Sequence, residues 1–436
     1  MDIKKGNRAD AFRMLQCLTV AIRPLTVAEL AEILAFDFDT AKGGIPKLNP
    51  DWRWEDHEQA VLSTCSSLIT IVGSGDSGVV QFSHFSVKEF LLSERITTSA
   101  KDISRYHISL DDSHTVIARA CLGVLLRDPI DQNDAKTDAV SFARYAAEHW
   151  VTHARVENVA PRIRDGMECL FDPKKPYFSA WVKLHDVDNH RWANDPQIKM
   201  QPGAAPLYYA AFLGFHETVE HLILKYPHYA NAIGGDAGTA LHSASHAGQV
   251  EVVRSLLKCG VDVNALGRWG LPPLRFVLIR GRPDIVRCLL DHGADPNFHD
   301  GHQTPLHYAT TVGHLDVVRM LLEHNADVNS QTTDGVTPMS NAIRNCHSNG
   351  EHVEIVRLLL EHGANPNARD NQRRTSLHLV LLPDKESSFR LEIARILLAH
   401  DADVSAEDEM GRTPLQVASE TGQDEMVHLL SENGSG

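Results

Sequence analysis

The sequence predicts a mostly α-helical protein in which a solenoid of short helical repeats follows a small domain and a helical connector. Two observations lead to this prediction. A four-residue pattern centred on leucine or methionine recurs seven times after residue 200, at intervals close to 33 residues. Between its copies, apolar residues recur at the three- and four-residue spacing of one helix face. Such repeats stack side by side, because each carries an apolar face that it cannot bury alone.

The recurring pattern has its fullest form at Thr304-Pro305-Leu306-His307. Its seven copies start at residues 205, 239, 272, 304, 337, 375 and 413, so the steps between them are 34, 33, 32, 33, 38 and 38 residues. A period near 33 with a Thr-Pro-Leu-His start resembles the ankyrin repeat. The resemblance covers residues 201–436 and implies a protein-binding surface.

The fourth repeat shows why this pattern folds into two helices. Thr304 can cap a helix because its hydroxyl can accept from an unpaired backbone N–H, and Pro305 fits the first helical position. Gly313 suits the left-handed residue that ends a short helix. A second helix is predicted from the apolar stripe Val317, Val318, Leu321 and Leu322. Asn325, which occupies the place of Gly in other repeats, ends that helix, and Asp334-Gly335 forms the turn to the next repeat.

Two repeats are longer than the others. The fifth has extra polar residues around 345–350 and the sixth has residues 382–388. Both additions fall between the first and second helices, where an insertion can loop out without breaking the stack. They are interpreted either as decoration or as a second contact surface. The first repeat has Tyr226-Pro227-His228-Tyr229 in place of the usual Gly-Ala-Asp and is predicted to act as an N-terminal adaptor.

The N-terminal third predicts three helices, a hairpin and a fourth helix, which is the order of a winged helix. Helices are expected at 11–21, 27–35, 55–67 and 86–93, with hairpin strands at 68–72 and 79–82. Thr26 with Glu29 reads as a capping box. The predicted domains are a winged-helix-like domain at 1–98, a helical connector at 99–200 and the ankyrin repeats at 201–436.

Three motifs carry a second resemblance. They are the segment Arg-Pro-Leu-Thr-Val-Ala-Glu-Leu at 23–30, the segment Phe-Ser-His-Phe-Ser-Val-Lys-Glu-Phe-Leu at 82–91, and Tyr-Ala-Ala-Glu-His-Trp at 145–150 with His153. Together they resemble the winged helix and connector that follow the nucleotide-binding domain in fungal NACHT–ankyrin proteins, which are STAND or NLR-like. The resemblance implies a setting in signalling or non-self recognition in a fungus.

The chain departs from that family in one respect. It starts almost at the winged helix, and it contains no Gly-x-x-x-x-Gly-Lys-Ser/Thr loop to cradle phosphates. The nucleotide-driven switch of the family is therefore not carried over to this chain. The sequence is interpreted as a fragment, as a truncated gene product, or as a family member without the NTPase domain that works as a scaffold.

Bulk properties limit the partner and the compartment. The net charge of −15 argues against nucleic acid or an anionic membrane as a general partner. Seven widely spaced cysteines without a Cys-x-x-Cys pair predict free thiols in a reducing compartment. Residues 1–10 are polar, unlike a secretory signal, and no apolar run approaches the roughly 18–20 residues that span a bilayer. A cytoplasmic location is expected, and a nuclear one is left open.

Motifs that resemble chemical sites have simpler explanations. The Gly-x-Gly-x-x-Gly match at 73–78 lies between two expected strands, whereas the dinucleotide motif requires a following helix, so a hairpin turn is predicted. His242 and His246 have a spacing that could bind a metal, but the repeat's histidine is expected to bond backbone groups of the neighbouring loop. No catalytic, cofactor-binding or metal-binding residue and no small-molecule substrate is predicted.

Two functions outside protein binding are alternatives. A winged helix can bind DNA, but the expected third helix begins with acidic residues, and residues 1–100 hold 10 basic against 13 acidic side chains. A transcriptional regulator would require a basic patch formed in three dimensions. An enzyme with a site in the connector would require a deep pocket lined by converging polar groups at 100–200.

The predicted docking site is the concave face, which hairpin tips and first helices form. Arg268 and Trp269 at the third tip are the expected hot spot, with packing of Trp269 against a neighbouring tip as the alternative. The other candidate contacts are Phe298, His299, His302, Tyr308, Thr332, Thr333, Gln372, Arg374, Met410 and Arg412. A peptide or folded protein with some acidic groups fits this mixture. Hydrogen bonding within the loop, rather than hydroxylation, is the expected role of Asn264, Asn297, Asn329 and Asn367.

Overall fold

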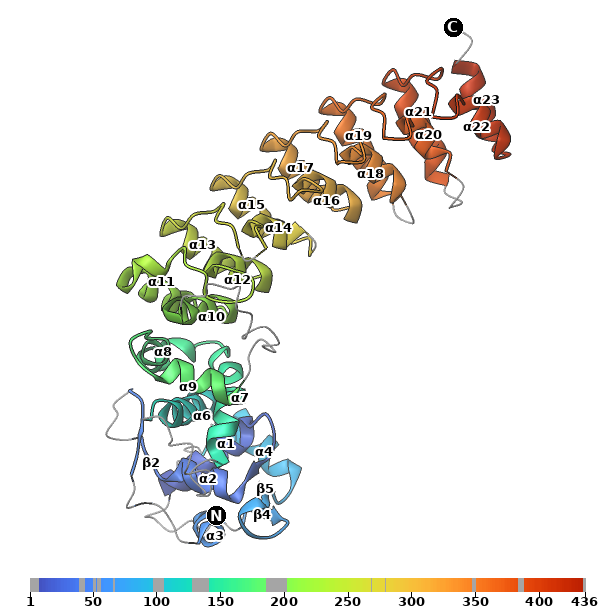
Figure 1. Ribbon diagram of the computed structural model, residues 1–436. Coiled ribbons are helices and arrows are strands. Elements are labelled where there is room, and N and C mark those ends of the chain that lie inside the picture. The colour runs from blue at the N-terminus through green and yellow to red at the C-terminus, as the bar shows by residue number, and fades with distance from the viewer. Residues whose placement is uncertain are drawn as a thin grey trace. The chain divides into compact units, whose positions relative to one another are not determined.

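The computed structural model describes residues 8–38, 44–49, 52, 56–65, 67–96, 106–127, 141–185, 202–267, 269–278, 280–346, 350–382 and 388–433 (Figure 1). Its internal contacts divide the chain into two compact units, Met1–Tyr229 and Ala230–Gly436. The first helix pair of the repeats thus belongs to the first unit. The domain boundaries after residues 98 and 200 remain predictions from the sequence.

The N-terminal domain has the expected order of helices and strands. Its helices are α1 (Arg8–Val20), α2 (Val27–Leu34), α3 (His57–Cys65) and α4 (Phe85–Leu92). Strands β4 (Ile69–Val72) and β5 (Val79–Phe82) form the predicted hairpin, and β1 (Leu25–Thr26) completes a sheet of order β1-β5-β4. A separate pair, β2 (Phe36–Asp37) and β3 (Lys47–Leu48), was not expected. Strands of two residues show too little alternation to be predicted.

Local chemistry in this domain follows the sequence closely. The Gly-rich segment at 73–78 is the hairpin turn, and it contains the 3-10 helix η3 (Gly75–Ser77). At the start of α2, the Glu29 N–H donates to Thr26 Oγ1 at 3.2 Å and the Thr26 N–H donates to Glu29 Oε2 at 2.9 Å. This is the predicted capping box, and it satisfies two unpaired donors at the helix start.

The connector is helical, with α6 (Leu110–Leu125), α7 (Ser141–Ala154), η7 (Ala160–Ile163), α8 (Arg164–Leu170) and α9 (Tyr177–Leu184). Its core is aromatic. The ring of Trp150 lies 5.4 Å from that of Trp181 and 5.5 Å from that of Phe215, centroid to centroid. Phe215 belongs to the first ankyrin repeat, so this cluster explains why that repeat groups with the connector.

A chain of hydrogen bonds through the buried Tyr145 and His153 joins the winged helix to the connector. The Ile22 N–H donates to the Tyr145 hydroxyl at 3.1 Å, and that hydroxyl lies 2.9 Å from His153 Nε2. His153 Nδ1 lies 2.8 Å from His114 Nδ1. Only one of two facing nitrogens can carry the proton, so the chain requires at least one neutral imidazole. Burial, with the charges of His114 and His149, lowers the pKa of His153 to about 3.

Seven helix pairs follow within the described residues, as the seven copies of the pattern predict. They are α10 (Ala205–Leu213) with α11 (His216–Lys225), α12 (Ala240–Ala247) with α13 (Val250–Lys258), α14 (Pro273–Leu278) with α15 (Pro283–Asp291), α16 (Pro305–Val312) with α17 (Leu315–Glu323), α18 (Pro338–Arg344) with α19 (Glu351–Glu361), α20 (Ser376–Val380) with α21 (Ser388–Ala399), and α22 (Pro414–Glu420) with α23 (Asp424–Asn433). The expected insertions fall between α18 and α19 and between α20 and α21, but residues 347–349 and 383–387 of them lie outside the described residues.

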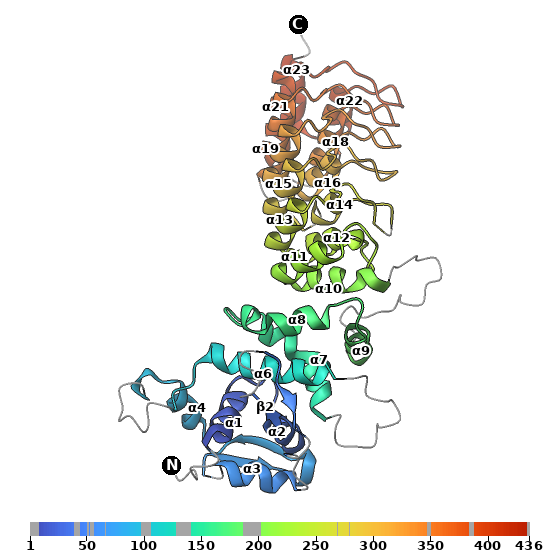
Figure 2. The same cartoon turned by 90° about the vertical axis from the view of Figure 1, so that its left-hand side faces the viewer.

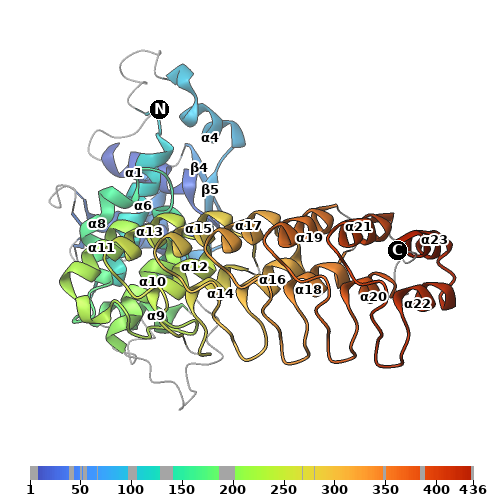
Figure 3. The same ribbon diagram turned by 90° about the horizontal axis from the view of Figure 1, so that it is seen from above.

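The helices of the second unit form two rows. The first helices, from α12 to α22, lie in one row and the second helices, from α13 to α23, lie in the other (Figure 2). Figure 3 shows the hairpins that connect the repeats projecting together beyond the row of first helices. The second row buries aliphatic residues, such as Val317 and Leu321 of α17, against the neighbouring repeats. The hairpins and the first helices together form the other face of the stack.

The repeat's histidine has the structural role expected of it. His307 Nδ1 lies 2.8 Å from Thr304 Oγ1, and its Nε2 lies 2.9 Å from the Val336 carbonyl oxygen of the next hairpin. His242 and His378 repeat this arrangement. Each imidazole therefore closes its own helix cap and ties two successive repeats together.

The repeat-end asparagines form a second set of links between repeats. Asn297 Nδ2 donates to the Asn325 carbonyl at 3.0 Å, while its Oδ1 accepts from the Asp327 N–H at 2.7 Å. Equivalent pairs of bonds are made by Asn264, Asn329 and Asn367. The sequence led us to expect hydrogen bonds within the loop, whereas these side chains bond to the backbone of the next repeat.

Two glycines with nearly equal backbone angles provide a test of packing between repeats. Gly313 has φ +87°, and a Cβ there would lie 2.7 Å from His352 Cε1 of the next repeat, whereas Gly293 has φ +85° and no heavy atom within 4 Å. Left-handed backbone costs a non-glycine residue roughly 1–2 kcal/mol. Overpacking adds about 1–3 kcal/mol. We therefore expect Gly313→Ala to lower the free energy of unfolding clearly more than Gly293→Ala in urea titrations, and equal losses would contradict the packing.

No helix among the described residues combines the length and apolarity that crossing a bilayer requires.

Candidate protein-binding surface

Acidic residues organise the hairpins that project from the first helices. Asp370 Oδ1 accepts the backbone N–H groups of Gln372 at 3.0 Å and Arg374 at 2.9 Å. Asp408 Oδ1 does the same for Met410 and Arg412, at 2.8 and 2.9 Å. Asp300 Oδ1 accepts from His302 and Gln303, at 2.9 and 2.8 Å. Each carboxylate fixes its turn and leaves Oδ2 to bind a side chain.

Burial opposes ionisation of Asp300, but hydrogen bonds to the charged form prevail. Donors from Gln303, Tyr308, His302 and Arg275 lower the pKa of Asp300 to about 2. Similar bonds, again against the effect of burial, lower the pKa of Asp370 and of Asp408. The hairpin carboxylates are therefore charged at neutral pH, and their arginine partners decide the charge of each tip.

An exposed aromatic pair marks the third repeat. The Trp269 side chain is 59% exposed, and its ring lies 5.8 Å from that of Phe276 on α14, with 31° between the planes. Phe276 in turn meets the imidazoles of His242 and His246 edge to face, at 5.5 and 6.2 Å. The indole is thus supported by the first helix of its own repeat rather than by a neighbouring tip, and it still presents most of its surface to solvent.

The next site along the face combines a cation, an aromatic ring and a carboxylate. The guanidinium of Arg275 lies 3.4 Å from the centroid of the Tyr308 ring, and Arg275 Nε lies 3.3 Å from Asp300 Oδ2. The Tyr308 hydroxyl donates to the same Oδ2 at 2.7 Å. Tyr308 is consequently held in place and half-buried, with its hydroxyl already used inside the protein.

Two predicted arginines are engaged in ion pairs within their own hairpins. Arg374 binds Asp370 Oδ2 through Nε and a terminal nitrogen at 3.0 and 2.8 Å, and Arg412 binds Asp408 Oδ2 in the same way at 3.1 and 2.9 Å. Arg412 also reaches Glu420 Oε2 at 3.1 Å. Both arginines therefore hold the shape of their own hairpin tips.

The remaining predicted contacts lie on the hairpins as expected, with different exposure. Met410 is 77% exposed. His299, His302, Thr333 and Gln372 are exposed, whereas Phe298 and Thr332 are half-buried. The Thr332 hydroxyl accepts the N–H groups of Asp334 and Val336, so it supports its turn. Arg268 lies outside the described residues.

Several residues of this face were missed in the sequence. Leu266 is 53% exposed beside the third tip, and Phe276, Arg275 and Arg344 project from first helices. One signal was available, because the spacing Asp-x-x-x-Arg-Thr occurs at 370–375 and again at 408–413. Arg344 gave no such signal, since its partner Asp370 lies 26 residues further along the chain.

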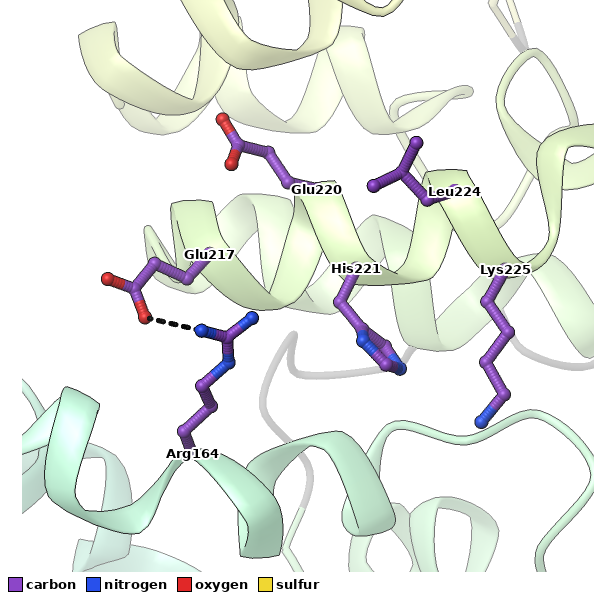
Figure 4. A pocket seen from close by; sticks show the side chains of 6 residues that line it. All are labelled: Arg164, Glu217, Glu220, His221, Leu224 and Lys225. Atoms are coloured by element: carbon purple, nitrogen blue, oxygen red, sulfur yellow. Dashed lines mark ion pairs between the residues drawn. The ribbon is translucent and has the colours of Figure 1, made fainter.

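A hollow of about 520 Å³ between α8 and α11 bears on the enzyme alternative (Figure 4). Its lining residues are Arg164, Glu217, Glu220, His221, Leu224 and Lys225. Arg164 lies 3.9 Å from Glu217 and donates to Glu168 at 2.8 Å, and His221 lies 3.3 Å from Glu168. Leu224 is 79% exposed. The hollow is thus an open seam of paired charges between two helices, which is unlike a deep pocket with converging polar groups.

A metal site is a further possibility for histidine-rich repeats. In the described part of the chain, no group of three or more His, Cys, Asp or Glu side chains has an arrangement that could hold a metal ion.

Comparison with known families identifies both halves of the chain. Residues 182–267 and 262–332 match the family described as ankyrin repeats (3 copies), and residues 321–380 match ankyrin repeats (many copies). Residues 1–102 match the GPI inositol-deacylase winged helix domain. The fold class expected from the sequence is therefore confirmed.

Curated relatives match parts of the chain. The azaphilone pigments biosynthesis cluster protein L of Monascus ruber is 31% identical over 271 residues, which are 58% of this chain and 56% of that protein. The cyclin-dependent kinase 4 inhibitor B of Mus musculus is 44% identical over 68 residues, 16% of this chain and 52% of the relative. This chain spans about half the length of each.

A solved structure, the ankyrin repeat domain of Bcl-3, aligns with 27% identity and a TM-score of 0.45, over 52% of this chain and 97% of that one. The family matches support the two domain types on which the resemblance rests, whereas the fungal setting and the absence of an NTPase domain remain expectations from the sequence. The chain carries ankyrin repeats and, ahead of them, a winged helix domain of the GPI inositol-deacylase type.

Proposed function

We propose that this protein is a scaffold or sensor arm that binds another protein through the hairpins and first helices of its ankyrin repeats, in signalling or regulation. The observation that carries the proposal is the Trp269 indole, which is 59% exposed and supported by Phe276. A large aromatic side chain held in place but open to solvent is the kind of group that dominates interface energies. We assign the protein no catalytic role.

The other contacts are proposed on the same face. Phe298, His299, His302, Tyr308, Thr332, Thr333, Gln372, Arg374 and Met410 surround or extend the row of tips, and we assign Arg412 mainly to holding its own turn. Hairpins of successive repeats are tied to each other, since the Asn371 N–H donates to the Asp334 carbonyl and the Glu409 N–H to the Gln372 carbonyl. A partner would therefore meet a preformed surface and lose less free energy to ordering it.

Direct DNA binding is not part of the proposal. Asp56, just before α3, and Glu58, in its first turn, are exposed to solvent. Their carboxylates repel phosphate. We propose instead that the winged helix is a packing module in a cytoplasmic protein, consistent with the hydrogen bond from the Ile22 N–H to Tyr145 of α7.

Capture of partners by the 436-residue chain tests this function. We expect Trp269→Ala to lower the recovery of a specific partner from native extract by about 10-fold or more, because truncating a hot-spot aromatic has effects of this order. Quantitative mass spectrometry of the captured proteins is the measurement. Trp52→Ala is the matched control, since Trp52 is 46% exposed in the N-terminal domain.

The comparison requires that both variants melt at the temperature of the unsubstituted chain. Equal recovery by Trp269→Ala and Trp52→Ala would remove the third repeat from the binding surface. Loss in the Trp52 variant alone would move recognition to the N-terminal domain.

A further inference from the structure

One hairpin carboxylate holds two arginines. Asp370 Oδ2 accepts from a terminal nitrogen of Arg344 at 2.7 Å and from Nε and a terminal nitrogen of Arg374 at 3.0 and 2.8 Å. Its side chain is 4% exposed, while those of Arg344 and Arg374 are 32% and 23% exposed. Two cations and one anion therefore leave a single positive charge at the rim of this hairpin.

The other two hairpin carboxylates provide the comparison. Asp300 binds one arginine, Arg275, whose positive charge balances that of the carboxylate. Its Oδ2 also accepts from the neutral Tyr308 hydroxyl. Asp408 binds Arg412 alone, and that arginine also pairs with Glu420, which leaves a negative charge. Both turns form with one arginine, so the second arginine on Asp370 is not required to hold the turn.

Other charges of both signs surround this hairpin. Arg373 lies at the tip with φ +56°, and Arg373 and Arg369 are exposed, so they add positive charge. Two negative charges offset them: Asp334 on the preceding hairpin acts on Arg344, and the exposed Glu409 lies on the following hairpin, where its N–H donates to the Gln372 carbonyl. Burial and the charge of Arg374 lower the pKa of Arg344, against the opposing effects of Asp370 and Asp334.

The donors of Arg344 remain partly available. Its bond to Asp370 uses one terminal nitrogen, and no other described residue accepts from its Nε or its second terminal nitrogen. A guanidinium presents paired N–H groups in a planar fork that matches the two oxygens of a carboxylate. Arg344 thus presents a partly exposed guanidinium with an excess positive charge. This local charge is opposite in sign to the net charge of the protein, which is −15.

We propose that Arg344 and Arg374 form a receiving site for one carboxylate side chain, a glutamate or aspartate, of the bound protein. The inference rests on the proposed function, because the site lies on the same row of hairpins and first helices as Trp269. A single excess charge matches a carboxylate better than a phosphate dianion. Recognition then has two parts, an apolar anchor at Trp269 and an acidic residue at the Asp370 hairpin.

The test uses a displayed library of random 12-residue peptides selected on the 436-residue chain. We expect the selected peptides to be enriched in glutamate or aspartate. For one synthesised peptide, Arg344→Gln should weaken binding by about 10-fold, as expected for loss of a charge-assisted hydrogen bond. Replacing its acidic residue by the amide should have the same effect, and the two changes together should add little.

Arg319→Gln is the control, because Arg319 is exposed on α17 and its replacement removes the same charge from the second row of helices. Thermal melts of both variants identify any loss of folding.

Three other outcomes are distinguishable. Peptides that depend on Trp269 but show no acidic preference and no response to Arg344→Gln would overturn the carboxylate site and keep the proposed function. A phosphoserine peptide that binds more tightly than its glutamate form would overturn the choice of carboxylate. If no peptide depends on Trp269, the proposed function fails, and this inference fails with it.

Discussion

Replacing Trp150 with alanine should cost the first unit about 3–5 kcal/mol of unfolding free energy, the usual penalty for removing a large buried aromatic side chain. Trp150 is fully buried and packs against Trp181, Phe171 and Phe215. Its indole N–H has no hydrogen-bond partner among the described residues, so the loss would come from packing alone.

Denaturant unfolding followed by amide hydrogen exchange is the measurement. Protection should fall in Met1–Tyr229, including α10 and α11, because Phe215 joins the first repeat to this cluster. The exposed Trp52→Ala variant controls for the loss of an indole. A loss below about 1 kcal/mol would show that the aromatic cluster does not hold the connector together.

Acidification should destabilise both units before the carboxylates titrate. Burial lowers the pKa of His153 to about 3 and that of His242 to about 4, the latter against an opposing hydrogen bond to the Leu271 carbonyl. The unfolded chain takes up a proton near pH 6.5, so it binds more protons than the folded chain between about pH 6.5 and 4. Stability is therefore complete above this window and falls as the pH decreases through it.

The expected loss between pH 7 and pH 5 is roughly 2 kcal/mol for each of these two histidines, one in each unit. Protonation of His242 Nδ1 would also destroy the acceptor that serves the Thr239 N–H at 3.2 Å. Urea titrations at pH 5, 6 and 7 give the slope directly.

A variant within the repeat pattern sharpens this test. Gln416 occupies the histidine position of the last repeat, where its Oε1 accepts from the Thr413 N–H at 2.9 Å. His242→Gln should consequently keep the helix cap and lose the bond to Leu271. At pH 7 this variant should be less stable than the unsubstituted chain. Between pH 7 and pH 5, however, its free energy of unfolding should fall by about 2 kcal/mol less. An unchanged pH slope would exclude His242 as a source of acid sensitivity.

The candidate site was predictable where it depends on position within a repeat. A residue that stands just before the Thr-Pro-Leu start lies on a hairpin, so the repeat pattern alone places Trp269, Thr333, Gln372 and Met410 on the hairpins. The role of each residue was harder to predict. Tyr308 and Arg374 look alike in sequence as candidate contacts, yet each already donates to a carboxylate of its own repeat.

The sequence by itself determined the number and order of the repeats, the capped starts of α2 and α16 and the winged-helix order, because caps, turns and apolar periodicity are local. It did not determine that the first repeat groups with the connector, which depends on contact between Trp150 and Phe215. Nor did it show that Arg344 meets Asp370 and leaves a charge in excess. Such pairs lie far apart along the chain, and only the packing of one repeat on the next brings them within bonding distance.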